Sequence, residues 1–334
     1  AFLSALGGKR KAITVTGPHF EKLSSSYGIT DDGTAVIEMS ACAGLPLVYG
    51  KKNPELTTTY GVGELICNAA RSGAKRIVIG LGGSATNDGG CGAAAAAGIK
   101  FYDKSGKSFI PVGKTLKDIA SIDYSGLDSA LSGVSISAMC DVDNPLLGET
   151  GAANVFGPQK GATPEQVALL DQALSRYASV LSSQLGSDAA QRDGAGAAGG
   201  IGCAMMAFFG ASFLSGIDLV LDAAGFSTAV AGADLVLTGE GQLDAQSAYG
   251  KVPCGVARRA KAVRNVPVLA IGGALGDGAE SLYSCGVDAL ASTVSRITTL
   301  ESAMANAVAS IEETTARTMR LLDAGRKMEQ NKVS

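Results

Sequence analysis

The sequence predicts an α/β protein made of two α/β lobes, and three observations support this class. Short β-branched runs alternate with segments of helical periodicity, glycine-rich loops follow several of those runs, and residues beyond 230 repeat a regular alternation of strand and helix. Glycine accounts for 45 of the 334 residues. This exceeds the usual share of about 7% and is typical of a chain with many tight turns.

The first 230 residues are expected to form one mixed α/β domain, in which a strand meander is followed by alternating helices and strands. The helix after Thr163 is the most clearly marked, because Thr163, Pro164 and Gln166 supply an N-cap, a first-turn proline and a capping-box partner. The expected strands are 12–16, 34–39, 76–81, 99–102 and 134–139, and the expected helices are 59–71, 93–97, 164–185 and 203–214.

Residues 231–334 are expected to form a second lobe with parallel strands, since each short apolar run is separated from the next by a helical segment. The predicted strands are 235–238, 266–271 and 287–292, and the predicted helices are 254–263, 278–284 and 300–322.

Composition excludes several classes of function. A net charge of −3 provides no basic surplus for binding nucleic acid. Seven cysteines are spread singly with no C-x-x-C pair, which favours reduced thiols and a cytoplasmic protein over a disulfide framework. No apolar stretch reaches the roughly 20 residues that a bilayer requires, so no membrane span is expected. Small-molecule partners therefore fit this chain best.

The loop Gly80-Leu-Gly-Gly-Ser-Ala-Thr-Asn-Asp-Gly-Gly90 follows a predicted strand and precedes a helix. Its glycines let backbone N–H groups turn toward an anion, so phosphate or carboxylate binding is one interpretation. A packing turn capped by Asn87 or Asp88 is the other. Gly80, Gly82 and Ala85 also satisfy the dinucleotide pattern G-x-G-x-x-A, with Asp103 about 20 residues later. Against that pattern, Asp88 places a carboxylate that suits a magnesium and phosphate site better.

Three further segments carry charged residues near predicted strand or helix ends. Asp141 and Asp143 follow the strand 134–139 and are candidates to hold Mg²⁺ or act on a hydroxyl, or else to form an Asx turn. Gln159 and Lys160 lie between two glycines before the capped helix and are candidates for anion binding. In the second lobe the candidates are Glu240, Asp244 and Lys251, around a loop expected after the first strand.

With these segments in view, the sequence closely resembles the bacterial glycerate kinases that form 2-phosphoglycerate. The resemblance spans about residues 1–297 and several long motifs in order. They are TAVIEM (34–39), NPELTTTYGVGEL (53–65), IGLGGSATNDGG (79–90), CDVDNPLLG (140–148), FGPQKGATPE (156–165), GAGAAGG (194–200) and LTGEGQLDAQSAYGKVPCGVA (237–257).

The resemblance implies one flavodoxin-like lobe formed by the two chain ends and one inserted lobe, with ATP and glycerate between them. It also implies direct, Mg²⁺-assisted transfer of the γ-phosphoryl group, which depends on positioning and charge stabilisation. The expected catalytic residues are Asp88, Asp141, Asp143, Glu240 and Asp244, with Mg²⁺ on Asp141 and Asp143. The expected substrate or phosphate contacts are Gly82, Gly83, Ser84, Thr86, Asn87, Gln159, Lys160 and Lys251.

Relatives are expected to carry about 50 residues before the position that matches residue 1, enough for two further strands of a flavodoxin-like sheet. Two rival hypotheses stay open at this point. One is an NAD-dependent oxidoreductase using the Gly80–Ala85 loop, and the other is a shortened, non-catalytic relative that binds glycerate. The phosphorylated hydroxyl, the preferred enantiomer and assembly into a homo-oligomer are also open.

Overall fold

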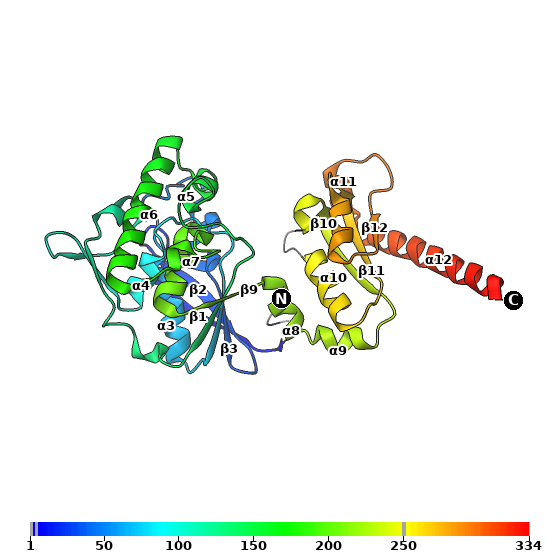
Figure 1. Cartoon of the computed structure of the whole chain (residues 1–334), viewed down its shortest axis with the longest axis horizontal. Helices are drawn as coiled ribbons and strands as arrows, with labels where there is room; N and C mark the ends of the chain where they lie inside the picture. Colours follow the sequence, from blue (N-terminus) through cyan, green and yellow to red (C-terminus); the bar gives the residue numbers. More distant parts are fainter. Residues whose placement is uncertain (1–2, 4–5, 249–251, 334) are drawn as a thin grey trace. The chain divides into compact units, whose positions relative to one another are not determined.

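A computed structural model describes residue 3, residues 6–248 and residues 252–333, and it confirms the α/β class. The described chain divides into two units, Ala1–Gly216 and Ile217–Ser334. Figure 1 shows both units and labels many of their helices and strands. Each unit has its own sheets and its own buried apolar cluster.

The first unit is built on a six-stranded sheet of order β1-β2-β3-β4-β8-β9. Its first three strands form an antiparallel meander, whereas β3, β4, β8 and β9 run parallel. The strands are β1 (Lys9–Thr16), β2 (Lys22–Ile29), β3 (Thr34–Glu38), β4 (Arg76–Gly80), β8 (Ser135–Met139) and β9 (Ser212–Leu214). The loops that leave β3, β4 and β8 therefore meet at one edge of the sheet, where open α/β sheets bind ligands.

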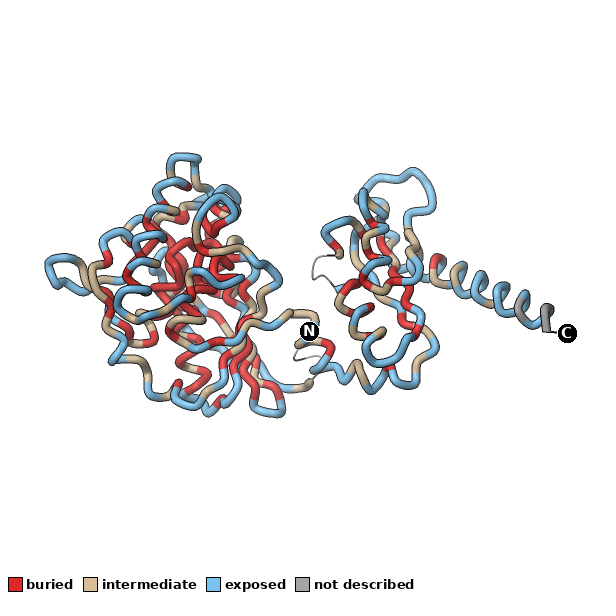
Figure 2. The backbone as a smooth tube through the Cα atoms, viewed as in Figure 1, coloured by how far each residue is buried: buried red, intermediate tan, exposed pale blue. Residues whose placement is uncertain are grey.

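Helices and a small second sheet pack around this sheet. The second sheet has the order β6-β5-β7 and is antiparallel. Two apolar clusters fill the unit, and Figure 2 shows the buried backbone concentrated here. The remaining elements are α2 (Ser40–Ala43), η1 (Leu45–Val48), α3 (Tyr60–Arg71), α4 (Cys91–Ala96), β5 (Lys100–Tyr102), β6 (Ser108–Phe109), η2 (Gly113–Asp118), β7 (Ser121–Asp123), η3 (Ser129–Leu131), α5 (Ala152–Phe156), η4 (Pro158–Lys160), α6 (Pro164–Leu185), η5 (Ala189–Gln191) and α7 (Ala197–Phe209).

Local capping signals were reliable guides to these elements. The predicted cap of α6 is confirmed: Thr163 Oγ1 accepts from the Gln166 N–H, and Gln166 Oε1 accepts from the Thr163 N–H. The apolar helix expected over 203–214 is instead α7, which ends at Phe209, and the next residues form β9. Gly210, at φ 59°, ends the helix in a left-handed conformation.

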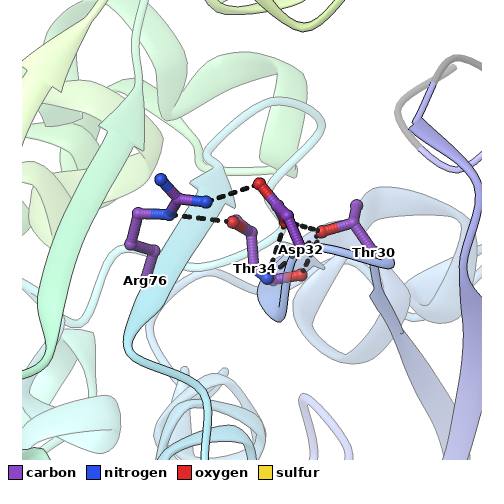
Figure 3. A network of polar contacts seen from close by, with 4 residues as sticks. All are labelled: Thr30, Asp32, Thr34 and Arg76. Atoms are coloured by element: carbon purple, nitrogen blue, oxygen red, sulfur yellow. Dashed lines mark hydrogen bonds and ion pairs between the residues drawn. The ribbon is translucent and has the colours of Figure 1, made fainter.

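A polar network holds β3 in register with β4 at the sheet edge away from the loops just described (Figure 3). Asp32 accepts from the Thr30 hydroxyl and the Thr34 N–H, and its other oxygen pairs with Arg76. Arg76 Nε also donates to Thr34 Oγ1 at 3.0 Å. The Thr30 hydrogen bond, followed by those from Thr34, lowers the pKa of Asp32. Because the ion pair between Asp32 and Arg76 is largely exposed, it adds little to the free energy of unfolding and mainly orients the two side chains.

The second unit is built on a parallel three-stranded sheet of order β10-β11-β12, which confirms the predicted parallel pairing. Its final helix is broken at Asn306, and Figure 1 shows α12 leaving the sheet as a long helix. The elements are α8 (Gly216–Ala223), α9 (Phe226–Ala231), β10 (Val236–Leu243), η6 (Ala245–Ala248), α10 (Val252–Val263), β11 (Val268–Leu275), η7 (Ala279–Cys285), β12 (Ala289–Ser292), α11 (Leu300–Ala305) and α12 (Ala307–Val333).

The boundary between the units lies at residues 216 and 217 rather than near 230, where the sequence placed it. The reason is packing: Leu221 of α8 and Val230 of α9 are buried in the same apolar cluster as Val236 and Val256. These two short helices therefore belong with the second sheet.

None of the helices among the described residues is both long enough and apolar enough to cross a membrane. All seven cysteines are free, and all but Cys140 are buried. Burial raises the pKa of Cys42, Cys67 and Cys203 to about 12, so these thiols stay protonated near neutral pH.

Candidate active site

The loop after β4 presents backbone N–H groups without intramolecular partners at the carboxyl edge of the main sheet. Gly82 and Gly83 are exposed, whereas Ser84 is buried, and a side chain at Gly82 would meet nothing within 4 Å. Gly83 adopts φ +73°, which glycine tolerates. Across the described part of the chain, no hydrogen bond engages the N–H groups of Gly82, Gly83 and Ser84. Three successive free donors at this edge suit an anionic ligand.

Asp88, at the other end of the loop, is enclosed. Its side chain is 0% exposed, and its carboxylate accepts four hydrogen bonds, from the N–H groups of Thr59, Gly90 and Gly92 and from Thr59 Oγ1, at 2.7–3.2 Å. Burial raises the pKa of Asp88, and these four donors oppose that rise. An acid held in this way fixes the loop onto α3 and α4, so the environment supports a structural role instead of the catalytic role expected from the sequence.

Thr86 and Asn87 lie between these two ends and are fully buried. Neither the Thr86 hydroxyl nor the Asn87 amide forms a hydrogen bond with another described residue. Buried polar groups are seldom left unpaired, because each costs about 1–3 kcal/mol. These groups therefore need partners from outside the protein, such as ordered water or a ligand.

The segments that carry the resemblance converge on this loop. Thr57 Oγ1 donates to the Ala85 carbonyl at 2.9 Å, and the Gly89 N–H donates to the Gly199 carbonyl at 3.0 Å. Gly199 approaches so closely that a side chain there would lie 1.9 Å from the Thr86 oxygen. Motifs far apart in the sequence thus shape one loop.

Lys160, a candidate for anion binding from the sequence, is enclosed by the protein. Its side chain is 1% exposed and its Nζ donates to the Thr86 carbonyl at 2.7 Å. Burial lowers the pKa of Lys160 to about 7, while Asp88 opposes that shift. The neighbouring Gln159 is exposed, and its carbonyl accepts from Lys52 Nζ at 3.0 Å. Lys160 therefore supports the loop from inside and is not an open contact for a phosphate.

Asp141 and Asp143 follow β8, the strand beside β4, and both are exposed. Asp141 Oδ1 accepts from the Gly216 N–H at 3.1 Å, which tethers one carboxylate to the first residue of α8. No group of three or more His, Cys, Asp or Glu residues within the described ranges forms a ready metal site. The two acids nevertheless project from the same sheet edge as the free N–H groups.

The candidates of the second unit differ from the predicted loop. β10 continues to Leu243, so Glu240 is a strand residue that pairs with Gly272. Gly239 of β10 allows this close pairing, since a side chain there would lie 2.5 Å from the Ile271 oxygen of β11. Glu240 accepts from Ser247 Oγ at 3.1 Å. Asp244 immediately precedes η6 and accepts from the N–H groups of Gln246 and Ser247, whereas Lys251 lies outside the described residues.

Glu240 also lines a cavity of about 690 Å³. The cavity walls are the glycine-rich ends of β10 and β11 and the apolar side chains of α11 and α12. The structure thus provides two groups of candidate residues, one in each unit.

The geometry departs from a dinucleotide site in two respects. Ten residues separate Gly80 from the start of α4, so the helix does not begin at the glycine pattern as in a βαβ dinucleotide unit. The strand before Asp103, β5, belongs to the small antiparallel sheet and is no neighbour of β4. Asp103 instead accepts from Ser105 and Lys107 in its own turn. The spacing of Gly80, Gly82, Ala85 and Asp103 matches the dinucleotide pattern, but the strand and helix topology around them is not that of a dinucleotide-binding unit.

We expect Gly199→Ala to disturb the loop, because its Cβ would collide with the Thr86 carbonyl. Gly186→Ala is a matched control, since Gly186 has φ +61° but nothing within 4 Å. Both variants incur the left-handed backbone cost, and the collision should lower the free energy of unfolding of Gly199→Ala by about 2 kcal/mol more. Equal values in urea titrations would show that the loop accommodates the methyl group.

Comparison with known proteins bears directly on this arrangement. A model of the glycerate kinase family matches residues 1–323. The chain belongs to the glycerate kinase family. It is 46% identical over 316 residues to a glycerate kinase of Bacillus subtilis, covering 94% of this chain and 82% of that protein. It is also 46% identical over 309 residues to the glycerate 2-kinase of Escherichia coli K12, and the match covers 92% of this chain and 81% of that protein.

A crystal structure from Salmonella typhimurium LT2 that carries the name glycerate kinase 2 is similar over 98% of this chain and 86% of its own, with a TM-score of 0.85 at 44% identity. Membership in this family makes the chain an enzyme of the kinase class. The family resemblance found in the motifs is thereby confirmed.

Sequence reasoning missed the contribution of Thr57, Thr59 and Gly199. Each contacts the loop through a bond or close approach that joins distant segments. Both segments have an unusual composition, which could have drawn attention to them: three threonines at 57–59 and the run GAGAAGG at 194–200. Neither composition indicates which loop the segment contacts.

Proposed function

We propose that this member of the glycerate kinase family transfers the γ-phosphoryl group of ATP directly to glycerate, forming 2-phosphoglycerate. One observation carries the proposal: the free N–H groups of Gly82–Ser84 and the carboxylates of Asp141 and Asp143 follow neighbouring parallel strands at one sheet edge. Such a site combines donors for an anion with acids that interact with a hydroxyl or a cation. Both are needed for phosphorylating a hydroxy acid.

The N–H groups of Gly82, Gly83 and Ser84 are the proposed contacts for a carboxylate or phosphate. The buried polar groups of Thr86 and Asn87 are proposed to act next to them through ordered water or ligand oxygens. In the second unit, Glu240 and Asp244 stay candidates for the nucleotide or its cation. The proposed binding partners are the small molecules ATP and glycerate, and no macromolecular partner is proposed. The proposed location is the cytoplasm.

The residues present fit Mg²⁺. Exposed carboxylates are hard oxygen ligands, and Mg²⁺ binds through one or two of them while retaining several waters. Asp141 and Asp143 would hold the ion, which when bound neutralises charge on the transferring phosphoryl group. The tether from Gly216 to Asp141 orients one of these carboxylates.

We expect ADP release in the presence of ATP and D-glycerate to require a divalent ion. Excess EDTA should reduce the rate to background, and added Mg²⁺ should restore it, as measured by a coupled ADP assay. Undiminished turnover in EDTA would remove the ion from the proposal. Calorimetric titration with NADH is the control for the oxidoreductase alternative: NADH binding without binding of ATP and Mg²⁺ would contradict the proposed reaction.

A further inference from the structure

A buried cation lies inside the loop that follows β4, and the reaction itself does not explain it. Lys160 is 1% exposed at the end of η4, and one of its three N–H donors bonds the Thr86 carbonyl. Within the described part of the chain its ammonium makes no other hydrogen bond, and Asp88 is the acid that acts on it. Burying a charged lysine with so little compensation is costly, so a methionine would stabilise this interior better unless the charge is used.

The bond from Lys160 is one of four contacts that fix Ala85, Thr86, Asp88 and Gly89 in the loop. Thr57 holds the Ala85 carbonyl, Thr59 holds Asp88, and Gly199 accepts from Gly89. The carbonyl that Lys160 holds belongs to Thr86, and the next residue is Asn87. These two residues carry the buried polar groups without partners. Lys160 therefore acts at the point in the loop where a ligand or water has to be received.

We propose that Lys160 is a positioning residue, whose buried ammonium holds the Gly82–Asp88 loop in its anion-binding arrangement and adds positive charge behind it. The proposal rests on the proposed function only in assigning the loop to the anionic substrate. Asp88 is the charged group among the described residues that acts on Lys160, and Lys52, on the neighbouring surface, bonds Gln159 instead. Loss of the charge should loosen the loop without removing any group that contacts substrate.

Two substitutions of Lys160 separate its possible contributions. Lys160→Met removes both charge and bond at similar volume, whereas Lys160→Gln keeps a donor that is neutral at every pH. Lys52→Met is the matched control, since Lys52 also donates to a backbone carbonyl but is exposed. If Lys160→Met does not fold, Lys160→Gln supports the same comparison.

The first readout does not depend on activity. The folded-state pKa of Lys160, about 7, lies below its ordinary value of 10.5, so the unfolded chain binds more protons between these values. Stability should therefore rise with pH in the native protein relative to either Lys160 variant. From pH 7.5 to 9.5 we expect the ratio of their unfolding constants to change by at least about tenfold, and Lys52→Met should show no such change. A pH-independent ratio would show that burial does not lower the pKa of Lys160 in the folded protein, and would contradict the uncompensated burial from which the proposal is argued.

The second readout is hydrogen exchange of the amides of residues 82–90 at pH 6.5. Both Lys160 variants should lose about tenfold protection there, with other segments unchanged. In the same variants kcat/KM for D-glycerate should fall about 30-fold, mainly through KM, and the difference should shrink toward pH 9. Native-like exchange would overturn the positioning role. If the variants lose protection but the native protein does not turn over glycerate, the proposed function is contradicted. The positioning role of Lys160 in the loop would then still be supported.

Discussion

Asp141→Asn and Asp143→Asn are each expected to lower kcat by at least about 100-fold while leaving the fold intact. Both side chains are exposed after β8, so an isosteric amide disturbs no packing. The substitution removes a charge where the phosphoryl group moves, and such interactions act mainly in the transition state. Steady-state kinetics with ATP and D-glycerate at saturating Mg²⁺ would measure the effect.

Asp118→Asn provides the control for this pair. Asp118 is an exposed acid at the end of η2, and its loss should leave kcat within about twofold. Near-native turnover in both Asp141→Asn and Asp143→Asn would remove the loop after β8 from the mechanism.

Asp88→Ala is expected to act on stability before it acts on chemistry. The substitution leaves four buried donors without an acceptor, three of them backbone N–H groups. We expect the free energy of unfolding to fall by at least about 3 kcal/mol, as measured by urea titration. Asp88→Asn should also destabilise the protein, because its amide nitrogen would face donors.

The matched control for Asp88 is Asp103→Ala. Asp103 also accepts from backbone N–H groups in a turn, but it lies where water can replace the carboxylate. Its loss should cost less than about 1 kcal/mol. A stable Asp88→Ala protein with abolished turnover would restore the catalytic role that the sequence suggested for this residue.

The sequence predicted most elements because their signals are local. The capping box before α6 and the β-branched run of β4 specify those elements without help from distant residues. β2 was missed, since its run KLSSSYGI is rich in serine, and its pairing with β1 supplies the stabilisation that its composition lacks. The extension of β10 through Gly239 and Gly241 likewise depends on pairing with β11.

The site was predictable in its segments and less so in its roles. Glycine runs and acids after strands indicated the loops that follow β4 and β8, since parallel strands end at one edge. The enclosure of Lys160 and Asp88 was not visible, because it arises where η4, α3 and α7 pack on one loop. A lysine between glycines looks the same in sequence whether it faces water or the Thr86 carbonyl.

Product analysis by phosphorus NMR tests the central proposal most directly. The protein would be incubated with ATP, Mg²⁺ and D-glycerate, and the resonances of products would be compared with authentic 2-phosphoglycerate and 3-phosphoglycerate. The proposal predicts ADP and 2-phosphoglycerate in equal amounts, with no ADP formed when glycerate is omitted. ADP accompanied only by inorganic phosphate, or 3-phosphoglycerate as the product, would contradict it.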